Sequence, residues 1–410
     1  MSDDPRVLVV HSGARHNYAI PSAFAGAGML EAFYTDMCAG KGVGRVAAGA
    51  LPGGLGALGQ RLANRLPPEP VLAKTRTDDI ETVRYEMNVR RMDDPSERRR
   101  ALAAHNRRRG ETMARWGTGN ATHLYNVLGE GGALCGLARD KGLTVFSDII
   151  IALSTSAIHD AEFERFPDWG PAPPSIDGPR SNDHLLATTD VFVCPSAFVA
   201  DDLVANWGVT REATRIVPYA LSSSWYGLES RPEPGRVLFV GSADRRKGIH
   251  YLAMAADRLS QGGEAYTFRV AGDAHPTVRA HKAAKALDFL GRVSRDAVRA
   301  EFAAADVFVL PTLAEGSATV IYEAMAAGLA VITTHAAGSV IRDGVDGLVI
   351  PERDPVALAG AIETVIGDRA LRNRLGSAAK ARAQAFGWDA YADALVGLVQ
   401  ETPGARSVAC

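Results

Sequence analysis

The sequence predicts an α/β fold in which two doubly wound domains of about equal size face a central crevice. Three observations lead to this prediction. The chain has 410 residues, which is too long for one small domain. Short apolar runs alternate with helical patterns along almost its whole length, as in parallel sheets covered by helices on both faces. The series starts afresh at about residue 235, after the polar, Pro- and Gly-rich stretch SSSWYGLESRPEPG.

The first half of the chain offers six strand candidates, and residues 1–225 are expected to form the first domain. The candidates are RVLVVHS (6–12), EAFYTD (31–36), THLYNV (122–127), LTVFSD (143–148), DVFVCPS (190–196) and TRIVPY (214–219). Each is short and apolar, as expected of a strand that is buried on both faces.

Residues 41–110 interrupt this order and are expected to form a helical excursion on the first domain. The segment holds 15 Lys and Arg against 8 Asp and Glu, a local excess of 15 − 8 = 7 positive charges. One interpretation is a solvated helical face. The other is a surface that meets anionic lipid or an anionic acceptor.

The second half offers six further strand candidates, and residues 235–385 are expected to form the second domain. They are RVLFVGS (236–242), TFRVAG (267–272), LDFLG (287–291), DVFVLPT (306–312), LAVITT (329–334) and DGLVI (346–350). Ligands of doubly wound sheets bind outside the carboxyl ends of the strands. The crevice between the two domains is therefore the place where a site is expected.

Bulk composition excludes several classes of protein. A formal net charge of -2 gives no argument for binding nucleic acid. Four widely separated cysteines form no CxxC motif, which fits a reducing cytoplasm and argues against a structural zinc site. The start MSDDPRVLVV lacks the bases of a signal peptide, and no run is apolar enough for a transmembrane helix.

The stretch DVFVLPTLAEGSATVIYEAMAAG reads as a strand, a turn and a helix, with Ser317 as the candidate helix cap and Gly328 as the stop. The free amides and positive dipole end of that helix would point into the crevice. Small residues at 316–318 would let an anionic ligand approach the backbone. These features predict a phosphate site.

Two carboxylates flank this predicted phosphate site. Glu323 lies about 9 Å along the helix axis, roughly the reach from a diphosphate to its ribose, and a carboxylate can accept hydrogen bonds from a ribose diol. Glu315 lies on the other side of the phosphates, where a transferred group would sit. Taken singly, each residue could equally be an ordinary solvated acid.

Loops after other strands of the second half would border the same site. The first strand ends at Gly241, and its loop carries Arg245, Arg246 and Lys247, cations that suit a leaving diphosphate. The alternative is a solvated basic loop. The loops VAGDAHP and LDFLGRVSRD follow two more strands, and backbone at 290–293 would read a base edge.

These motifs resemble those of retaining nucleotide-sugar glycosyltransferases of family 4, which have the GT-B architecture of two Rossmann-like domains. The resemblance covers about residues 235–403 strongly and the first half only diffusely. It rests on VGS with RKG, VAGD, LGRV, ADVFVLPT, EGSATVIYEAMAAGLAVITT, AGSVIRDGVDGLVIPERDPVALAGAI and FGWDAYADALVGLV. Glu315 and Glu323 match the two glutamates that this family separates by seven residues.

The resemblance implies roles for these positions. Glu315 would contact hydroxyls of the donor sugar, Glu323 would bind the ribose, and Arg246 and Lys247 would hold the diphosphate. Ser242 stands where many members have an arginine, so that role is assigned to Arg246, with Arg245 as the alternative. The implied donor-binding set is Gly13, Gly241, Ser242, Gly272, Arg292, Val293, Gly316, Ser317, Ala318, Thr319 and Glu323, and no metal or cofactor is expected.

The first half contributes further candidates by the same resemblance. Its glycine-containing loop is HSGARHNYAIP with Gly13, which is not the GxGxxG of dehydrogenases. His159 or Asp148 would take the place of a histidine that faces the donor sugar in many relatives, and both are included among the catalytic candidates. Residues 386–405 resemble a helix that crosses back onto the first domain.

The expected function is transfer of a sugar, with retention of configuration, from a UDP- or GDP-linked donor to an acceptor hydroxyl. Products would belong to cell-surface glycans, lipid-linked sugars or small glycosides. The expected location is cytoplasmic, with residues 41–110 as a candidate contact to the inner face of the membrane. The alternatives are a sugar-nucleotide epimerase of the same architecture and a non-catalytic sugar-nucleotide-binding protein.

Overall fold

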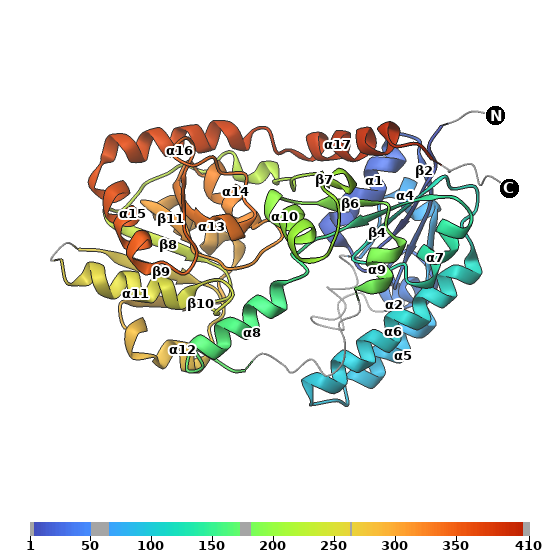
Figure 1. Ribbon diagram of the computed structural model, residues 1–410, viewed down its shortest axis with the longest axis horizontal. Coiled ribbons are helices and arrows are strands. Elements are labelled where there is room, and N and C mark those ends of the chain that lie inside the picture. Colours follow the sequence, from blue (N-terminus) through green and yellow to red (C-terminus); the bar gives the residue numbers. More distant parts are fainter. Residues whose placement is uncertain (1–3, 51–64, 173–181, 263–264, 405–410) are drawn as a thin grey trace.

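The computed structural model describes residues 4–50, 65–172, 182–262 and 265–404. They form two α/β domains, each built on a twisted parallel sheet (Figure 1). Every strand pair in both sheets is parallel. The predicted class of two doubly wound domains is therefore confirmed.

The first sheet has seven strands in the order β3-β2-β1-β4-β5-β6-β7. Their bounds are β1 Val7–Val10, β2 Leu30–Thr35, β3 Thr75–Thr77, β4 His123–Val127, β5 Thr144–Asp148, β6 Val191–Cys194 and β7 Thr214–Ile216. Helices that belong to this half are α1 Ala19–Gly26, α2 Gly42–Ala50, α4 Glu69–Ala73, α5 Asp79–Val89, α6 Pro95–Trp116, α7 Ala133–Asp140, α8 Thr155–Arg165, α9 Asp183–Thr188 and α10 Ala197–Asn206.

The second sheet has six strands in the order β10-β9-β8-β11-β12-β13. Their bounds are β8 Arg236–Val240, β9 Thr267–Ala271, β10 Leu287–Gly291, β11 Val307–Leu310, β12 Ala330–Thr334 and β13 Leu348–Ile350. The helices of this half are α11 Ile249–Ser260, α12 Pro276–Ala280, α13 Arg295–Ala304, α14 Thr319–Ala326, α15 Pro355–Gly367, α16 Arg369–Ala383 and α17 Trp388–Glu401.

All twelve strand candidates correspond to strands of the two sheets, whereas β3 was not predicted. This three-residue edge strand lies inside the 41–110 excursion and pairs with β2 through Phe33↔Thr75. The excursion is otherwise helical where the structure describes it, and residues 51–64 of it lie outside the described residues. Its last helix, α6, continues to Trp116.

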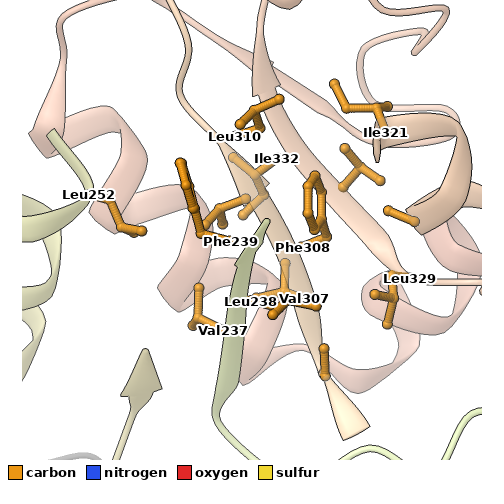
Figure 2. Close-up of a cluster of buried hydrophobic side chains, with 14 of the residues drawn as sticks. Val237, Leu238, Phe239, Leu252, Val307, Phe308, Leu310, Ile321, Leu329 and Ile332 are labelled. Atoms are coloured by element: carbon orange, nitrogen blue, oxygen red, sulfur yellow. The ribbon is translucent and has the colours of Figure 1, made fainter. Parts of the chain in front are cut away.

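The core of the second domain forms where β8 and β11 lie side by side and helices cover both faces. Phe239, Phe308 and Ile332 are fully buried, together with Leu252 from α11 and Ile321 from α14 (Figure 2). This packing fixes the strand ends at which the loops of the candidate site begin.

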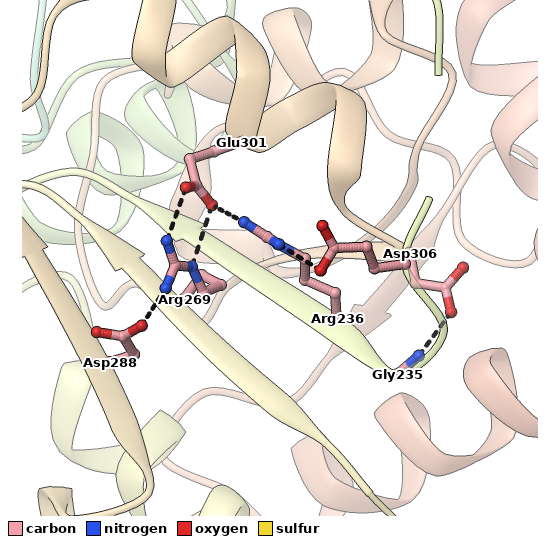
Figure 3. Close-up of polar contacts among 7 residues, drawn as sticks. Gly235, Arg236, Arg269, Asp288, Glu301 and Asp306 are labelled. Atoms are coloured by element: carbon pink, nitrogen blue, oxygen red, sulfur yellow. Dashed lines mark hydrogen bonds and ion pairs between the residues drawn. The ribbon is translucent and has the colours of Figure 1, made fainter. Parts of the chain in front are cut away.

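A charged network links residues in and near β8, β9 and β11 of this sheet (Figure 3). Glu301 of α13 accepts from Arg236 at 2.7 Å and from Arg269 at 2.9 Å. The Asp306 carboxylate accepts from the Gly235 amide at 2.9 Å.

The chain crosses between the domains again after α16, and α17 packs against α1 of the first domain (Figure 1). Tyr391, Leu395 and Val399 of α17 are buried in the core of the first domain. The segment between α16 and α17 is bonded to residues 219–222, which lead from the first domain into the second, since the Leu221 amide donates to the Phe386 carbonyl at 2.7 Å.

No helix in the described parts of the chain is both long enough and apolar enough to cross a membrane.

Candidate functional site

The candidate site lies at the carboxyl ends of β8 and β11, where the strand order of the second sheet reverses. Such a switch point is the usual ligand site of an open parallel sheet. The two loops are bonded to each other there. The Leu313 amide donates to the Arg246 carbonyl at 2.8 Å, and the Thr312 hydroxyl donates to the same oxygen at 3.0 Å.

Glu315 is held between two cations from the β8 loop. Its Oε1 lies 2.7 Å from Arg246 Nη1 and 2.8 Å from Lys247 Nζ. Only 14 to 24% of these three side chains is exposed. The structure thus brings together the three residues that were expected to act on the sugar and the diphosphate.

The small residues after Glu315 have a role that was not foreseen. A side chain at Gly316 would place its Cβ 1.8 Å from the carbonyl oxygen of Ile150, in the first domain. The Gly316 carbonyl accepts from the Ser196 hydroxyl at 2.5 Å. Glycine is needed here because backbone of the first domain occupies the space that a side chain would take.

The prediction that Ser317 caps the helix is wrong. α14 begins at Thr319 with Ala318 at its N-cap position, and no side chain caps it. The Ser317 hydroxyl instead bonds the Tyr322 hydroxyl at 2.9 Å, and both residues are buried. The first turn of a helix leaves its amides without intrahelical partners. Thr319 is exposed, so the open end of the helix begins there.

Glu323 lies one turn into α14 and is partly buried. Burial raises the pKa of its carboxyl group to about 7, while nearby Arg295 acts in the opposite direction. No hydrogen bond or ion pair of this carboxylate occurs within the residues that the structure describes. A carboxylate of this kind is available for a ligand's hydroxyl groups.

The two arginines of the β8 loop differ in their surroundings. Arg246 is partly exposed and also donates to the Ala314 carbonyl at 2.8 Å. Arg245 is 2% exposed and donates to carbonyls of the chain segment that follows α8. Of the two, Arg246 is therefore the one that can reach a diphosphate.

His159 of α8 is brought to the site, although it comes from the first half of the chain. It lines a cavity of about 490 Å³ together with Ser242, Asp244 and Arg246. Burial lowers the pKa of His159, as does the nearby Arg245 guanidinium. The neutral imidazole is thereby favoured.

Asp148 is not brought to the site. It is 2% exposed at the end of β5, below α17, and its neighbours include Tyr125, Tyr219 and Tyr391. Burial raises its pKa to about 7. Being enclosed by tyrosines, its side chain has no access to a donor at Glu315.

The loop after β1 holds Gly13 by contacts inside the first domain. The Gly13 amide donates to Asp36 Oδ1 at 2.8 Å, and Asp36 is paired with Arg65 at 2.9 Å. His16, Asn17 and Tyr18 have φ values of 48°, 53° and 63°, a strained left-handed run for residues other than glycine.

The remaining donor-binding candidates lie at the ends of β8, β9 and β10. A Cβ on Gly272, whose φ is 153°, would lie 1.9 Å from the Gly241 carbonyl, so the glycine permits two loops to touch. Arg292 is exposed and pairs with Asp273 at 2.9 Å. Val293 is half-buried beside it.

Within the described residues, no group of three His, Cys, Asp or Glu side chains is arranged to hold a metal ion. The positive charge at the site comes from Arg246, Lys247 and the start of α14.

Comparison with known families gives this arrangement a context. Residues 234–368 match the family model described as glycosyl transferases group 1. This part of the chain therefore resembles a glycosyltransferase domain. The matched range holds Arg246, Lys247, Glu315 and Glu323.

Curated relatives of the glycosyltransferase domain have named activities. Glycogen synthase from Mycobacterium tuberculosis is 27% identical over 251 residues, covering 58% of this chain and 61% of that protein. The lipopolysaccharide core biosynthesis glycosyltransferase LpsE of Rhizobium meliloti is 30% identical over 227 residues, which cover 52% of this chain and 65% of LpsE. The chain thus spans less than two thirds of the length of these relatives.

Solved structures resemble the whole chain. Sucrose-phosphate synthase from Thermosynechococcus elongatus has a TM-score of 0.63 at 17% identity, covering 97% of this chain and 98% of that one. Anabaena HepE in complex with UDP-glucose has a TM-score of 0.58 at 15% identity, and the match covers 97% of this chain and 100% of HepE. These likenesses confirm the GT-B fold, and the family match with the named relatives supports a transferase enzyme.

Sequence reasoning missed two groups of site residues. Ile150 and Ser196 contact the loop at Gly316, and residues 169–172 line the cavity beside His159. All of them come from the first half of the chain, whose motifs are diffuse. The apolar and Gly/Pro-rich character of FPDWGPAP gave no sign of which domain it contacts.

Proposed function

We propose that the chain is a retaining glycosyltransferase that moves a sugar from a nucleoside diphosphate sugar to an acceptor hydroxyl group. The observation that carries this proposal is the Glu315 carboxylate held by Arg246 and Lys247 at the mouth of α14. Support also comes from the family match over the same residues and from HepE, a structural neighbour that was solved with UDP-glucose.

The two cations are suited to a leaving diphosphate. An arginine carries five N–H donors and a lysine three, so each can hold Glu315 and still donate to phosphate oxygens. As the bond between sugar and phosphate breaks, negative charge grows on the diphosphate, and fixed cations stabilise it. In this proposal Arg246, Lys247 and the helix end supply the positive charge, and no metal is required.

Each flanking carboxylate has a separate part in the proposal. Glu323, which has no protein partner in the described residues, accepts hydrogen bonds from the ribose. Glu315 contacts hydroxyl groups of the donor sugar, while its pairing with two cations fixes its position. The acceptor hydroxyl attacks from the side that the sugar's leaving group departs from, which retains the anomeric configuration.

The decisive experiment incubates the protein with UDP-glucose and GDP-linked sugars and follows release of the nucleoside diphosphate, with and without EDTA. Lys247→Ala is expected to lower turnover by at least about 100-fold, the usual scale for removing an electrostatic group that acts on the transition state. Lys285→Ala, an exposed lysine of the same domain, serves as the control. Unchanged turnover in both Lys247→Ala and Glu315→Ala contradicts the proposed site.

The acceptor proposed is a hydroxyl of a cell-surface glycan, a lipid-linked sugar or a small glycoside. LpsE, whose name refers to lipopolysaccharide core biosynthesis, supports the first of these. We also propose that the first domain touches a membrane surface through α2, α5 and α6, which carry exposed apolar and basic side chains.

A further inference from the structure

α8 and the residues that follow it belong to the first half of the chain but lie on the second domain. In Figure 1, α8 lies below the second sheet, and its residue Glu162 contacts His250 of α11. The attachment is made by polar and aromatic contacts of residues 162–171 with loops and helices of the second half. Arg245, in the loop after β8, makes three hydrogen bonds to the chain after α8.

Arg245 is enclosed by the segment Phe163–Pro171. Its Nη1 donates to the Gly170 carbonyl at 3.1 Å and to the Phe166 carbonyl at 3.4 Å, and its Nη2 donates to the Pro171 carbonyl. Its guanidinium lies 4.8 Å from the centre of the Phe163 ring. The residue is 2% exposed, so one buried side chain holds three carbonyls and an aromatic face.

Two further residues, Glu162 and Trp169, fix α8 and this segment in the same place. Glu162 is fully buried, lies 2.8 Å from His250 and 2.9 Å from Arg353, and so joins α8 to the second domain. The buried Trp169 ring stacks on His281 with 4.0 Å between ring centres.

This arrangement needs a guanidinium. The carbonyls of three different residues are spread around one planar group, whose two terminal nitrogens point in different directions. A lysine ammonium is a compact point charge and cannot reach all three at once. Arg246, the next residue, makes charge contacts with Glu315, for which a lysine is a partial substitute.

The fastened segment forms one wall of the cavity of about 490 Å³. His159 and residues 169–172 line it on one side, and residues 242–246 and 273–276 line it on the other. Arg246 lines this cavity and also contacts Glu315, so the cavity adjoins the proposed diphosphate position.

We propose that Arg245 is a positioning residue, which fastens residues 166–171 to the β8 loop and thereby builds the wall of the cavity that receives the nucleotide-sugar donor. This inference rests on the proposed function for the identity of the ligand. Arg245 also lines this cavity, but its terminal nitrogens are bonded to the carbonyls of the wall, and in this proposal it acts through them. It acts by holding the wall and the β8 loop in one arrangement before the donor arrives, which lowers the cost of ordering them on binding.

The test compares two neighbouring arginines with the same substitution. Arg245→Lys is expected to weaken UDP binding and to raise the KM for UDP-glucose by about tenfold or more, with kcat within about threefold of the parent, since binding and not chemistry is disturbed. Arg246→Lys is expected to lower kcat instead. Isothermal titration with UDP and steady-state kinetics with UDP-glucose measure both effects.

Trp169 reports on the wall without reference to activity. In the parent protein, the emission of Trp169 is obtained by subtracting the spectrum of Trp169→Phe from that of the parent. In Arg245→Lys, it is obtained by subtracting the spectrum of the double variant Trp169→Phe, Arg245→Lys from that of Arg245→Lys. A shift to longer wavelength is expected in Arg245→Lys and none in Arg246→Lys. Unchanged emission together with unchanged UDP affinity in Arg245→Lys overturns the inference.

A second variant disturbs the same contact from its other side. Gly170, whose carbonyl accepts from Arg245, has a φ of 115°, which residues with a side chain rarely adopt, so Gly170→Ala is expected to shift Trp169 emission and UDP affinity in the same direction by a smaller amount. If Arg245→Lys does not fold, parent-like behaviour of Gly170→Ala overturns the inference. Absence of UDP and GDP binding in the parent protein overturns the proposed function, while the emission of Trp169 still decides whether Arg245 holds the wall.

Discussion

At the scale of single residues, Gly316 shows how closely the two domains meet at the site. Its α-carbon faces the Ile150 carbonyl so closely that a methyl group would have to lie 1.8 Å from the oxygen. Neither group can move easily, because both belong to the backbone. The Glu315 side chain is one residue away, so any shift here displaces it from Arg246 and Lys247.

We predict that Gly316→Ala lowers turnover with the best donor by at least about tenfold, since small displacements of positioned groups have effects of this size or greater. Gly360→Ala is the matched control, because its Cβ would meet nothing within 4 Å on the surface of α15. The control is expected to keep its activity and to be slightly more stable. Parent-like kinetics of Gly316→Ala would mean that the domains separate at this point during turnover.

A second residue-scale prediction concerns Glu323 and pH. With a pKa of about 7, the carboxyl group is mostly ionised at pH 8 and mostly protonated at pH 6. If the ionised form is the one that accepts from the ribose, donor affinity falls about tenfold between pH 8 and pH 6. Titration with UDP-glucose, whose diphosphate does not titrate in this range, measures the change. Glu323→Gln is expected to bind more weakly with no such slope, and an equal slope in both proteins contradicts the role.

A third residue-scale prediction concerns Asp148 and the pH dependence of the free energy of unfolding. Its pKa is raised from 3.8 to about 7 in the folded protein, so the folded state binds the proton more tightly than the unfolded chain does. Its contribution is complete at low pH and is lost as pH rises from about 4 to 7, by about 1.4 kcal/mol per pH unit. Urea unfolding of Asp148→Asn should show a flatter pH dependence and greater relative stability at pH 8 than at pH 5. A parent-like dependence would show that Arg15 keeps the group ionised.

At the scale of elements, strands were predicted much better than helix positions. Most strands in the two sheets are apolar runs bounded by turn residues, and burial on both faces makes such runs visible. β3 reads Thr-Arg-Thr and holds no apolar residue, so it gives no apolar run to detect. α8 was not expected on the second domain, because it is held by the carboxylate of Glu162 and by contacts to backbone carbonyls, which leave no periodic apolar face.

In the candidate site too, residues that lie in recognisable motifs were predicted, and contacts between separate parts of the chain were not. Arg246, Lys247, Glu315 and Glu323 were found because motif residues lie next to strands, and strand ends were correctly placed. The contact at Gly316 was missed because its partner Ile150 is distant in sequence, whereas Ser317 was wrongly taken as the helix cap although its hydroxyl bonds that of Tyr322, in the same motif.

The element-scale prediction concerns α17, which completes the first domain. Leu395 is fully buried against that domain, so Leu395→Ala is expected to cost about 2–5 kcal/mol of its stability. Gln400→Ala, on the exposed side of the same helix, is the control and should lie within about 0.5 kcal/mol of the parent. Urea unfolding followed by circular dichroism measures both. Equal stability of the two variants would mean that α17 is not part of the cooperative unit.

At the scale of the whole molecule, exposed apolar side chains are concentrated in the 41–110 excursion. Six of the nine large apolar side chains that are exposed in the described residues lie there: Val43, Val46, Leu66, Ile80, Met87 and Leu102. Exposed arginines accompany them: Arg84, Arg90, Arg91, Arg98, Arg100 and Arg107. Apolar and basic groups together are typical of surfaces that bind anionic membranes.

We predict that the protein sediments with vesicles containing phosphatidylglycerol and not with vesicles of phosphatidylcholine alone, and that added salt weakens the binding. Ile80→Asp should reduce it, because Ile80 is 83% exposed and would enter the interface. Val356→Asp, at an exposed site on the second domain, should not. Equal binding by the two variants would locate the lipid contact elsewhere.

The paths that the chain takes between the domains decide where the protein can be recombined. Three segments cross over: residues 155–172 lie on the second domain, residues 219–222 lead into it, and α17 returns to the first. A single junction at residue 225 would therefore separate α17 from its core and α8 from Arg245. A chimera that exchanges donor domains must take residues 155–172 and 222–386 from one parent, and the rest, with α17, from the other.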